Sequence, residues 1–127
     1  MKKVSVITPC YNSYDYLDKC FESLVNQTIG IENMEIIFVN DASTDNTGEK
    51  LNSFEALYPD SVLVIHLNEN VKQVGARNVA LQYVSGEYLV FIDSDDWVDL
   101  TYLETVYNIV KENDVDMLQI PFVHVRG

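Results

Sequence analysis

Short apolar runs rich in β-branched residues recur along this chain and alternate with stretches in which apolar residues have helical spacing. Runs closed by Pro, Asn, Asp or Gly are typical of strands. Five strands are predicted, at residues 4–8, 35–39, 61–66, 88–92 and 117–123. Most are apolar throughout rather than alternating, which indicates that both faces of the sheet are covered.

Four helices are predicted between these strands. The first covers residues 17–25, with Ser13 or Asp15 as its N-terminal cap, and Gly30 ends that region. The other three carry apolar residues at Leu51, Phe54 and Leu57, at Val79, Ala80, Tyr83 and Val84, and at Leu103, Val106, Tyr107 and Val110. The order βαβαβαβαβ predicts an α/β fold, an open and mainly parallel sheet flanked by helices and joined by right-handed crossovers.

Composition limits the classes of function. The chain has 127 residues, enough for one domain with a sizeable core. Its formal net charge of −12 argues against nucleic acid as a partner, because like charges repel. No apolar stretch approaches the roughly 20 residues of a spanning helix, and the opening MKKVSVITP is interpreted as a strand rather than a signal peptide.

The cysteines and histidines offer little chemistry. Cys10 and Cys20 are not in a metal-binding spacing, so a reducing, cytoplasmic setting is expected. A nucleophilic Cys10 is disfavoured because no His lies near it in the sequence. His66 and His124 fall in predicted strands without metal spacing and are interpreted as structural.

Three polar loops, at residues 9–12, 40–45 and 93–96, each follow a predicted strand. In open parallel sheets, ligands bind beyond the C-terminal ends of the strands, at a switch in strand order. We therefore expect these three loops to converge on one edge of the sheet and to form the ligand site.

Four carboxylates, those of Asp93, Asp95, Asp96 and Asp99, fall within seven positions of the third loop. Carboxylates this close repel one another unless a cation holds them, and Mg²⁺ binds carboxylates together with substrate phosphates. The alternative is a helix N-terminus, where acidic side chains act as caps and favour the dipole. Asp96 and Asp99 fit this alternative, whereas the position after a buried strand favours a metal site that bridges to a diphosphate.

The other loops hold single candidates. Asp41 ends a strand, where a carboxylate can accept a hydrogen bond from a ribose hydroxyl or a base N–H. The following residues 43–45 fit an Asx turn and helix cap. Tyr11 offers a ring face to a planar base, although aromatic residues belong more often to the core. Arg77, in the segment VGARN near a helix start, could meet a phosphate or a base edge, or form a surface salt bridge.

Four stretches resemble the nucleotide-binding half of a family 2 glycosyltransferase with the GT-A fold. They are VSVITPCYN, IIFVNDASTDNT, GARNVAL and GEYLVFIDSDDWV, in the order and spacing of that family. The resemblance implies a Rossmann-like GT-A domain over residues 1–127 that binds a nucleotide-diphosphate sugar. A UDP-sugar is the expected donor, for inverting transfer to an acceptor hydroxyl in polysaccharide or glycolipid synthesis.

The resemblance also implies roles for single residues. Those that match Thr8, Pro9 and Tyr11 line the nucleoside pocket in the family, the match to Asp41 contacts the base, and the match to Arg77 lies beside the base or the diphosphate.

Asp93, Ser94 and Asp95 match the DxD motif of the family. Asp95 is then the expected direct metal ligand, with Asp93 beside it and nearer the ribose. The implied cofactor is Mg²⁺ or Mn²⁺, which stabilises the departing diphosphate.

One departure from the family concerns the second half, which carries the acceptor site and a general-base carboxylate. No residue here matches that base, because Asp114 and Asp116 lie near a strand start, at the wrong end of the sheet. The chain is therefore expected to be a fragment of a longer enzyme with a glycan or lipid-linked acceptor, at the inner face of the membrane. A truncated sheet could also expose an apolar edge and form a homodimer.

Three other classes of protein were compared with this pattern. A non-catalytic module that binds a nucleotide sugar or a partner is the main alternative, because the base is missing. A phospho-acceptor receiver domain would need an Asp after the third strand and a Lys after the fifth, and this chain has neither. A nucleotidyltransferase would need a Gly-rich basic loop near the first strand, which is also absent.

Overall fold

The computed structural model describes residues 2–112, so the strand predicted at residues 117–123 lies outside the described residues. Four strands are present in this part of the chain, β1 (Val4–Cys10), β2 (Met34–Asn40), β3 (Val62–His66) and β4 (Tyr88–Phe91). Four α-helices accompany them, α1 (Leu17–Val25), α2 (Thr47–Leu57), α3 (Lys72–Leu81) and α4 (Tyr102–Glu112), with a short 3₁₀ turn, η1 (Ile31–Asn33), before β2.

The sheet has the order β3-β2-β1-β4, and all three pairings are parallel. The chain thus moves outward from β1 to β2 and β3, and then returns to place β4 on the other side of β1. This reversal between β1 and β4 is a topological switch point, where helices leave the two strands in opposite directions and open a crevice. The α/β fold predicted from the pattern of apolar runs is confirmed.

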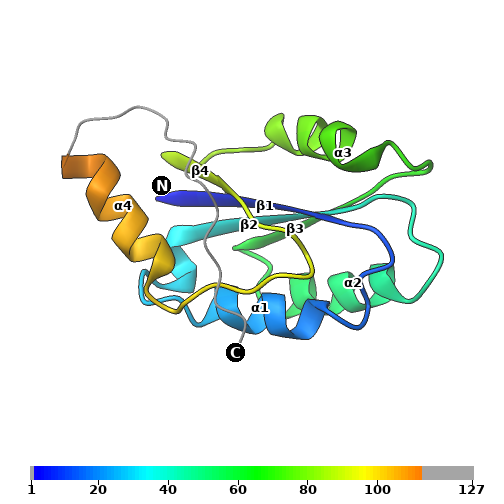
Figure 1. Cartoon of the computed structure of the whole chain (residues 1–127), viewed down its shortest axis with the longest axis horizontal. Coiled ribbons are helices and arrows are strands. Elements are labelled where there is room, and N and C mark those ends of the chain that lie inside the picture. Colours follow the sequence, from blue (N-terminus) through cyan, green and yellow to red (C-terminus); the bar gives the residue numbers. More distant parts are fainter. Residues whose placement is uncertain (1, 113–127) are drawn as a thin grey trace.

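Helices cover both faces of the sheet, with α3 on one side and α1 and α2 on the other (Figure 1). On the α3 side, Ala76 and Ala80 are fully buried, and their small side chains allow the helix to lie close to Ile7 and Ile37. These contacts explain the continuously apolar character of the strands.

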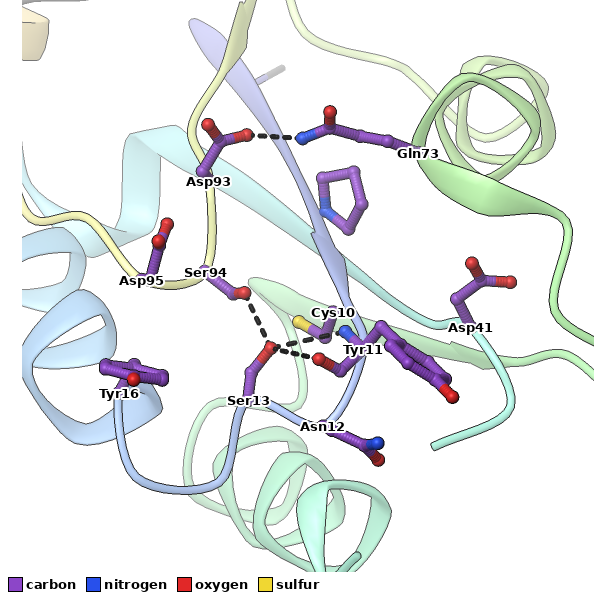
Figure 2. A pocket seen from close by; sticks show the side chains of 11 residues that line it. Cys10, Tyr11, Asn12, Ser13, Tyr16, Asp41, Gln73, Asp93, Ser94 and Asp95 are labelled. Atoms are coloured by element: carbon purple, nitrogen blue, oxygen red, sulfur yellow. Dashed lines mark hydrogen bonds between the residues drawn. The ribbon is translucent and has the colours of Figure 1, made fainter. Parts of the chain in front are cut away.

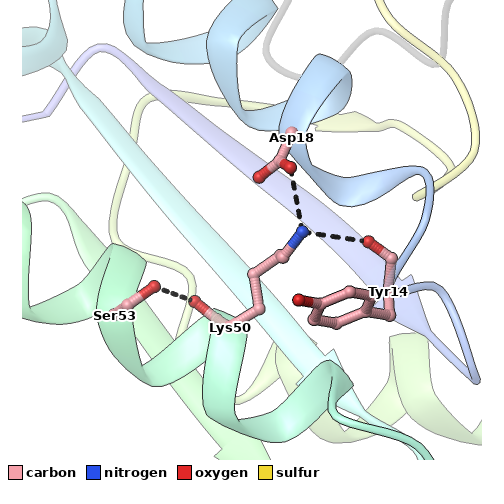
Figure 3. A network of polar contacts seen from close by, with 4 residues as sticks. All are labelled: Tyr14, Asp18, Lys50 and Ser53. Atoms are coloured by element: carbon pink, nitrogen blue, oxygen red, sulfur yellow. Dashed lines mark hydrogen bonds and ion pairs between the residues drawn. The ribbon is translucent and has the colours of Figure 1, made fainter.

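The opposite face has a larger core with aromatic side chains. Phe21 of α1 and Phe54 of α2 stack with their ring centroids 3.8 Å apart, and both rings are tilted against Phe38 of β2. At the outer surface of the same helices, Lys50 joins α2 to α1 (Figure 3). Its Nζ donates to Asp18 Oδ2 at 2.9 Å and to the carbonyl of Tyr14 at 3.2 Å.

Two helix starts differ from the prediction. Neither Ser13 nor Asp15 caps α1 through its side chain, because the residue before α1 is Tyr16 and no side-chain cap is present there. Instead, the backbone carbonyl of Ser13 accepts from the N–H groups of Tyr16 and Leu17. The hydroxyl of Ser13 therefore does not cap the helix and instead contacts the hydroxyl of Ser94.

Helix α3 begins at Lys72 and ends at Leu81, several residues earlier than its apolar residues suggested. Asn70 explains the early start, because its Oδ1 accepts from the backbone N–H of Lys72 and turns the chain into the helix. The prediction missed this turn because the first residues of the helix are polar and exposed. Arg77 is consequently in the interior of α3 rather than near its start.

The outer edge of β3 is partly covered from within the chain. The backbone N–H of Val64 donates to Glu55 Oε2 of α2 at 2.8 Å. A side chain that bonds an edge N–H hinders the addition of another strand there. The predicted homodimer is not tested by this contact and stays a prediction.

Helix α4 confirms the last predicted helix within residues 2–112. Its start is held by Gln27, whose Oε1 accepts from the backbone N–H of Leu103 at 2.9 Å. Asp99 lies before the helix, and its Oδ1 accepts from the backbone N–H of Thr101 at 3.0 Å, an Asx turn that leads the chain into α4. None of the helices in residues 2–112 has the length and apolar character needed to cross a membrane.

Candidate functional site

A cavity of about 380 Å³ opens at the C-terminal ends of β1, β2 and β4, at the switch point of the sheet (Figure 2). All three predicted loops contribute to it, and α3 forms part of its wall. The lining residues are Pro9, Cys10, Tyr11, Asn12, Ser13, Tyr16, Asp41, Gln73, Asp93, Ser94 and Asp95. The convergence expected from the strand-end loops therefore takes place.

The loop after β1 is joined to the acidic loop by a pair of hydroxyl groups. Ser13 Oγ lies 2.7 Å from Ser94 Oγ, and both side chains are buried (Figure 2). The backbone N–H of Ser13 donates to Thr47 Oγ1 at 2.9 Å, and that of Tyr11 donates to Ser13 Oγ at 3.2 Å. These contacts hold the backbone of Tyr11, which is 51% exposed and lines the cavity.

Asp41 is placed where β2 ends, and only 3% of it is exposed. Its backbone N–H donates to the carbonyl of Cys10 at 2.8 Å, and its Oδ1 accepts from the backbone N–H of Val71 at 2.7 Å. The carboxylate is thus held between the end of β1 and the residue that precedes α3. Asp41 also lines the cavity, and within residues 2–112 no hydrogen bond is made to its second oxygen, Oδ2.

The acidic loop brings three carboxylates together. Asp93, Asp95 and Asp96 each have an oxygen within 4.8 Å of the others. Oxygen ligands at this separation fit a hard divalent cation such as Mg²⁺ or Mn²⁺. Asp95 is exposed and Asp93 half-buried, whereas Asp96 is only 4% exposed. Asp96 was assigned to a helix start from the sequence, and the structure places it in the carboxylate cluster instead.

Asp99 is separate from this cluster and belongs to the start of α4. The backbone N–H and the hydroxyl of Thr101 both donate to its Oδ1, and these two bonds lower the pKa of Asp99. Asp99 therefore lies near the start of α4, as the sequence suggested, but its bonds go to Thr101 ahead of the helix, so it forms a turn into the helix and not the capping bond itself.

Asp93 is anchored by two residues of α3. Gln73 Nε2 donates to Asp93 Oδ1 at 2.7 Å, and the guanidinium of Arg77 lies 3.5 Å from the same oxygen. Both donors bring positive charge or an N–H dipole to this oxygen, on the side away from the neighbouring carboxylates of the acidic loop. Figure 2 shows Gln73 reaching from the helix towards Asp93.

Arg77 and Thr8 lie behind the cavity rather than on its surface. The Arg77 guanidinium packs over the Phe91 ring at 4.9 Å, and its Nε is buried without a partner among residues 2–112. Thr8 is fully buried within β1, and its hydroxyl likewise has no hydrogen-bond partner in the described part of the chain. Of the residues predicted to bind the donor, Pro9, Tyr11, Asp41, Asp93, Ser94 and Asp95 do line the cavity.

Some lining residues were missed from the sequence. Gln73 precedes Arg77 by four positions, and residues with this spacing share a helix face. A sequence prediction that began this helix at residue 72 would have placed Gln73 on the same face as Arg77, and so near the acidic loop. No sequence signal pointed to Ser13 or Tyr16, because their places depend on how the chain folds back after β1.

Comparison with known sequences decides the family. The profile of glycosyl transferase family 2 matches residues 5–127. The chain belongs to glycosyltransferase family 2.

Relatives of this family 2 domain include bacterial glycosyltransferases. It is 43% identical to the poly(ribitol-phosphate) beta-glucosyltransferase of Bacillus spizizenii, over 98% of this chain and 20% of that protein. It is 41% identical to glycosyltransferase GlyA of Streptococcus pneumoniae, over 91% of this chain and 16% of that protein. The chain therefore spans a fifth or less of the length of these two relatives.

Solved structures with the same fold include complexes with nucleotide sugars. S. aureus TarS in complex with UDP-GlcNAc matches with a TM-score of 0.81 and 32% identity, over 88% of this chain and 32% of that one. A mannosyltransferase from Pyrobaculum calidifontis, in complex with GDP-Man and Mn²⁺, matches with a TM-score of 0.74 and 27% identity, over 86% of this chain and 31% of that one. Both confirm the GT-A fold of this domain.

The two thiols of the family 2 domain are not nucleophiles at neutral pH. Burial raises the pKa of Cys10, which lines the cavity, well above its usual value. Burial, followed by the charges of Asp96, Asp95 and Asp93, raises the pKa of Cys20 to about 12. Both thiols are therefore protonated at pH 7, and a protonated thiol is a poor nucleophile.

Proposed function

We propose that this domain binds a nucleotide-diphosphate sugar, with UDP as the nucleotide, and positions it for inverting transfer of the sugar. The observation that carries this proposal is the composition of the cavity. It joins an exposed aromatic ring and a buried carboxylate on one side to a cluster of three carboxylates on the other. A nucleoside and a metal-bound diphosphate need these two environments side by side.

On the nucleoside side, Tyr11 would stack against the base, since its ring is exposed and its backbone is tied down through Ser13. Asp41 Oδ2 would accept a hydrogen bond from a donor on the base, because Oδ1 is already occupied by Val71. Uracil has one such donor, the N3–H. The similarity to TarS, which has been solved with UDP-GlcNAc, supports the choice of UDP.

On the diphosphate side, Asp95 would hold the cation, with Asp93 beside it. The cation would supply positive charge to the leaving diphosphate, as Mg²⁺ and Mn²⁺ do in phosphate sites. Gln73 and Arg77 would keep Asp93 Oδ1 engaged and so orient its other oxygen. The Mn²⁺ complex of the P. calidifontis mannosyltransferase supports a divalent cation in this fold.

Inverting transfer also needs a base that takes the acceptor's hydroxyl proton. Within residues 2–112, the carboxylates that line the cavity are Asp41, Asp93 and Asp95, and each has another role here. We therefore propose that the base, and the site for a glycan or lipid-linked acceptor, come from a longer parent enzyme. Two buried free thiols fit a reducing, cytoplasmic site of action, and a place at the inner membrane face would come from the parent enzyme.

The experiment is calorimetric titration of the folded chain with UDP, with and without Mn²⁺. Metal-dependent binding is expected, and Asp95→Ala should abolish the metal dependence while the circular dichroism spectrum is kept. Asp18→Ala is the matched control, because it removes an exposed carboxylate from α1, outside the cavity (Figure 3). A folded chain that does not bind UDP, or an Asp95→Ala variant that binds with unchanged metal dependence, would reject the assignment.

A second titration tests whether Asp41 contacts the nucleobase of the ligand. Asp41→Asn keeps an acceptor for Val71 but removes the negative charge near the base. We expect UDP affinity to fall about tenfold, since hydrogen bonds to charged groups are worth about 1.5–3 kcal/mol, while pyrophosphate with Mn²⁺ binds as before. Equal affinity of the wild type for UDP, ADP and GDP would contradict a base-reading Asp41.

A further inference from the structure

We propose that His66 is a positioning residue for the nucleoside side of the cavity. It orients the side chain of Asn40, and Asn40 in turn holds the turn that carries Asp41. This inference rests on the proposed function, because it assigns His66 a part in donor binding. The side chain of His66 does not line the cavity itself.

The contact joins the ends of two neighbouring strands. Asn40 and His66 are register partners at the last positions of β2 and β3, and Asn40 Nδ2 lies 3.0 Å from His66 Nδ1. Asn40 is 8% exposed. On the other side of the ring, His66 Nε2 lies 2.8 Å from Asn52 Oδ1 of α2.

The hydrogen bonds determine the roles of both side chains. The backbone N–H of Ser43 donates to Asn40 at 3.1 Å, so the atom it meets must be the amide oxygen Oδ1. The amide nitrogen of Asn40 therefore faces His66 and donates to Nδ1, which must be unprotonated. The proton of the neutral ring is then on Nε2, where it is donated to Asn52 Oδ1. Each donor in this chain of contacts meets an acceptor.

The turn held by Asn40 needs such support. The bond from Ser43 to Asn40 Oδ1 closes over Asp41 and Ala42. Ala42 has a φ of 58°, in the left-handed region that residues with a Cβ avoid. Loss of the Asn40 side chain would remove the bond that closes this turn, and with it one of the contacts that keep Ala42 in the left-handed region next to Asp41.

The same turn reaches the loop after β1. Ser43 Oγ accepts from the backbone N–H of Asn12 at 3.0 Å, and Asn12 Oδ1 accepts from the backbone N–H of Thr44 at 2.8 Å. Asn12 has a φ of 49° and lines the cavity next to Tyr11. Figure 2 shows Asn12 and Asp41 on two different segments of the cavity wall. His66 therefore acts, through one amide, on both segments.

Gly48 shows how closely this contact is packed. A Cβ at Gly48 would lie 2.9 Å from Asn40 Nδ2 and 3.5 Å from His66 Cε1. Glycine is unfavourable inside a helix by about 0.5–1 kcal/mol relative to Ala, yet it occupies the first turn of α2 here. The space it leaves is filled by the Asn40–His66 pair.

The test compares His66→Phe with His66→Gln in the folded chain. Phe fills the space without a hydrogen-bond acceptor, whereas the amide of Gln has both an acceptor for Asn40 and a donor for Asn52. We expect His66→Phe to bind UDP with Mn²⁺ about threefold to tenfold more weakly, as for the loss of one net hydrogen bond. His66→Gln should stay within about twofold of the wild type. Pyrophosphate with Mn²⁺, which does not use the nucleoside side, should bind equally to all three.

Amide hydrogen exchange of Ser43, measured by NMR without ligand, reports on the turn directly. It should be faster in His66→Phe than in wild type or His66→Gln. Unchanged UDP affinity in His66→Phe overturns the positioning role, whatever the exchange rate, and so does an equal loss of UDP affinity in both variants. A wild type that does not bind UDP rejects the proposed function instead, and Ser43 exchange still decides whether His66 holds the turn.

Discussion

The turn after β2 provides a stability prediction whose sign is set by one backbone angle. Ala42 has a φ of 58°, and the left-handed conformation costs a residue with a Cβ about 1–2 kcal/mol. Glycine adopts this conformation without that cost. Its greater freedom in the unfolded chain, however, cancels about 0.4–1 kcal/mol of the stability gained. The methyl group is only half-buried, so its loss adds little. We therefore expect Ala42→Gly to raise the free energy of unfolding by about 0.5–1 kcal/mol.

Ala56→Gly is the matched control, because it deletes the same methyl group at an exposed position within α2. The backbone there is helical, where Gly is less stable than Ala by about 0.5–1 kcal/mol. The free energy of unfolding is thus expected to rise in Ala42→Gly and to fall in Ala56→Gly, relative to the wild type. Urea unfolding followed by circular dichroism measures both free energies. The two variants can be compared if the free energy falls with urea concentration at a similar slope in each.

The reasoning is refuted if Ala42→Gly is destabilised by as much as Ala56→Gly. That result would mean that the turn does not hold Ala42 in the left-handed region in solution. The argument for His66 as the support of this turn would then lose its main premise as well.

Two further predictions concern close packing and the buried thiols. Gly86→Ala should lower the free energy of unfolding by about 1–3 kcal/mol, because the new Cβ would lie 2.8 Å from the backbone nitrogen of Ser5 in β1; unchanged urea unfolding would contradict this close approach. Cys10 and Cys20 should not react with a thiol reagent at pH 8 until urea unfolds the chain, since burial raises both pKa values. Because the pKa of Cys20 is raised from its ordinary 9.0 to about 12 in the folded chain, its contribution to stability is present below pH 9 and is lost as the pH rises towards 12; rapid labelling of the native chain would contradict burial.

Much of the candidate site could be predicted because it depends on where strands end. Asp41 and Asp93 directly follow apolar runs, and parallel strands bring their C-terminal ends to one edge. Local pattern was therefore enough to expect that the loops after β1, β2 and β4 would meet. It was not enough to exclude Asp96 from a helix start, because a carboxylate before a helix and a carboxylate in a metal cluster look alike in sequence.

The boundaries of α3 and the caps of α1 were mispredicted for a related reason. The polar residues Lys72 and Gln73 begin α3 on an exposed surface, so their hydrophobic pattern resembles a loop. The helix starts there because Asn70 turns the chain, and because Ala76 and Ala80 pack on the sheet. Such tertiary contacts supply most of the stability of a short helix.

The sequence by itself determined the alternation of strands and helices, the α/β class and the family, since apolar periodicity and four motifs are properties of neighbouring residues. Only the tertiary structure decided that β4 lies beside β1, that Gln73 holds Asp93, that Ser13 meets Ser94, and that His66 holds Asn40. The three side-chain pairs are between 20 and 81 residues apart. Each such hydrogen bond contributes a net of about 1 kcal/mol, too little to leave a pattern in the sequence, and it forms only after the core has brought its partners together.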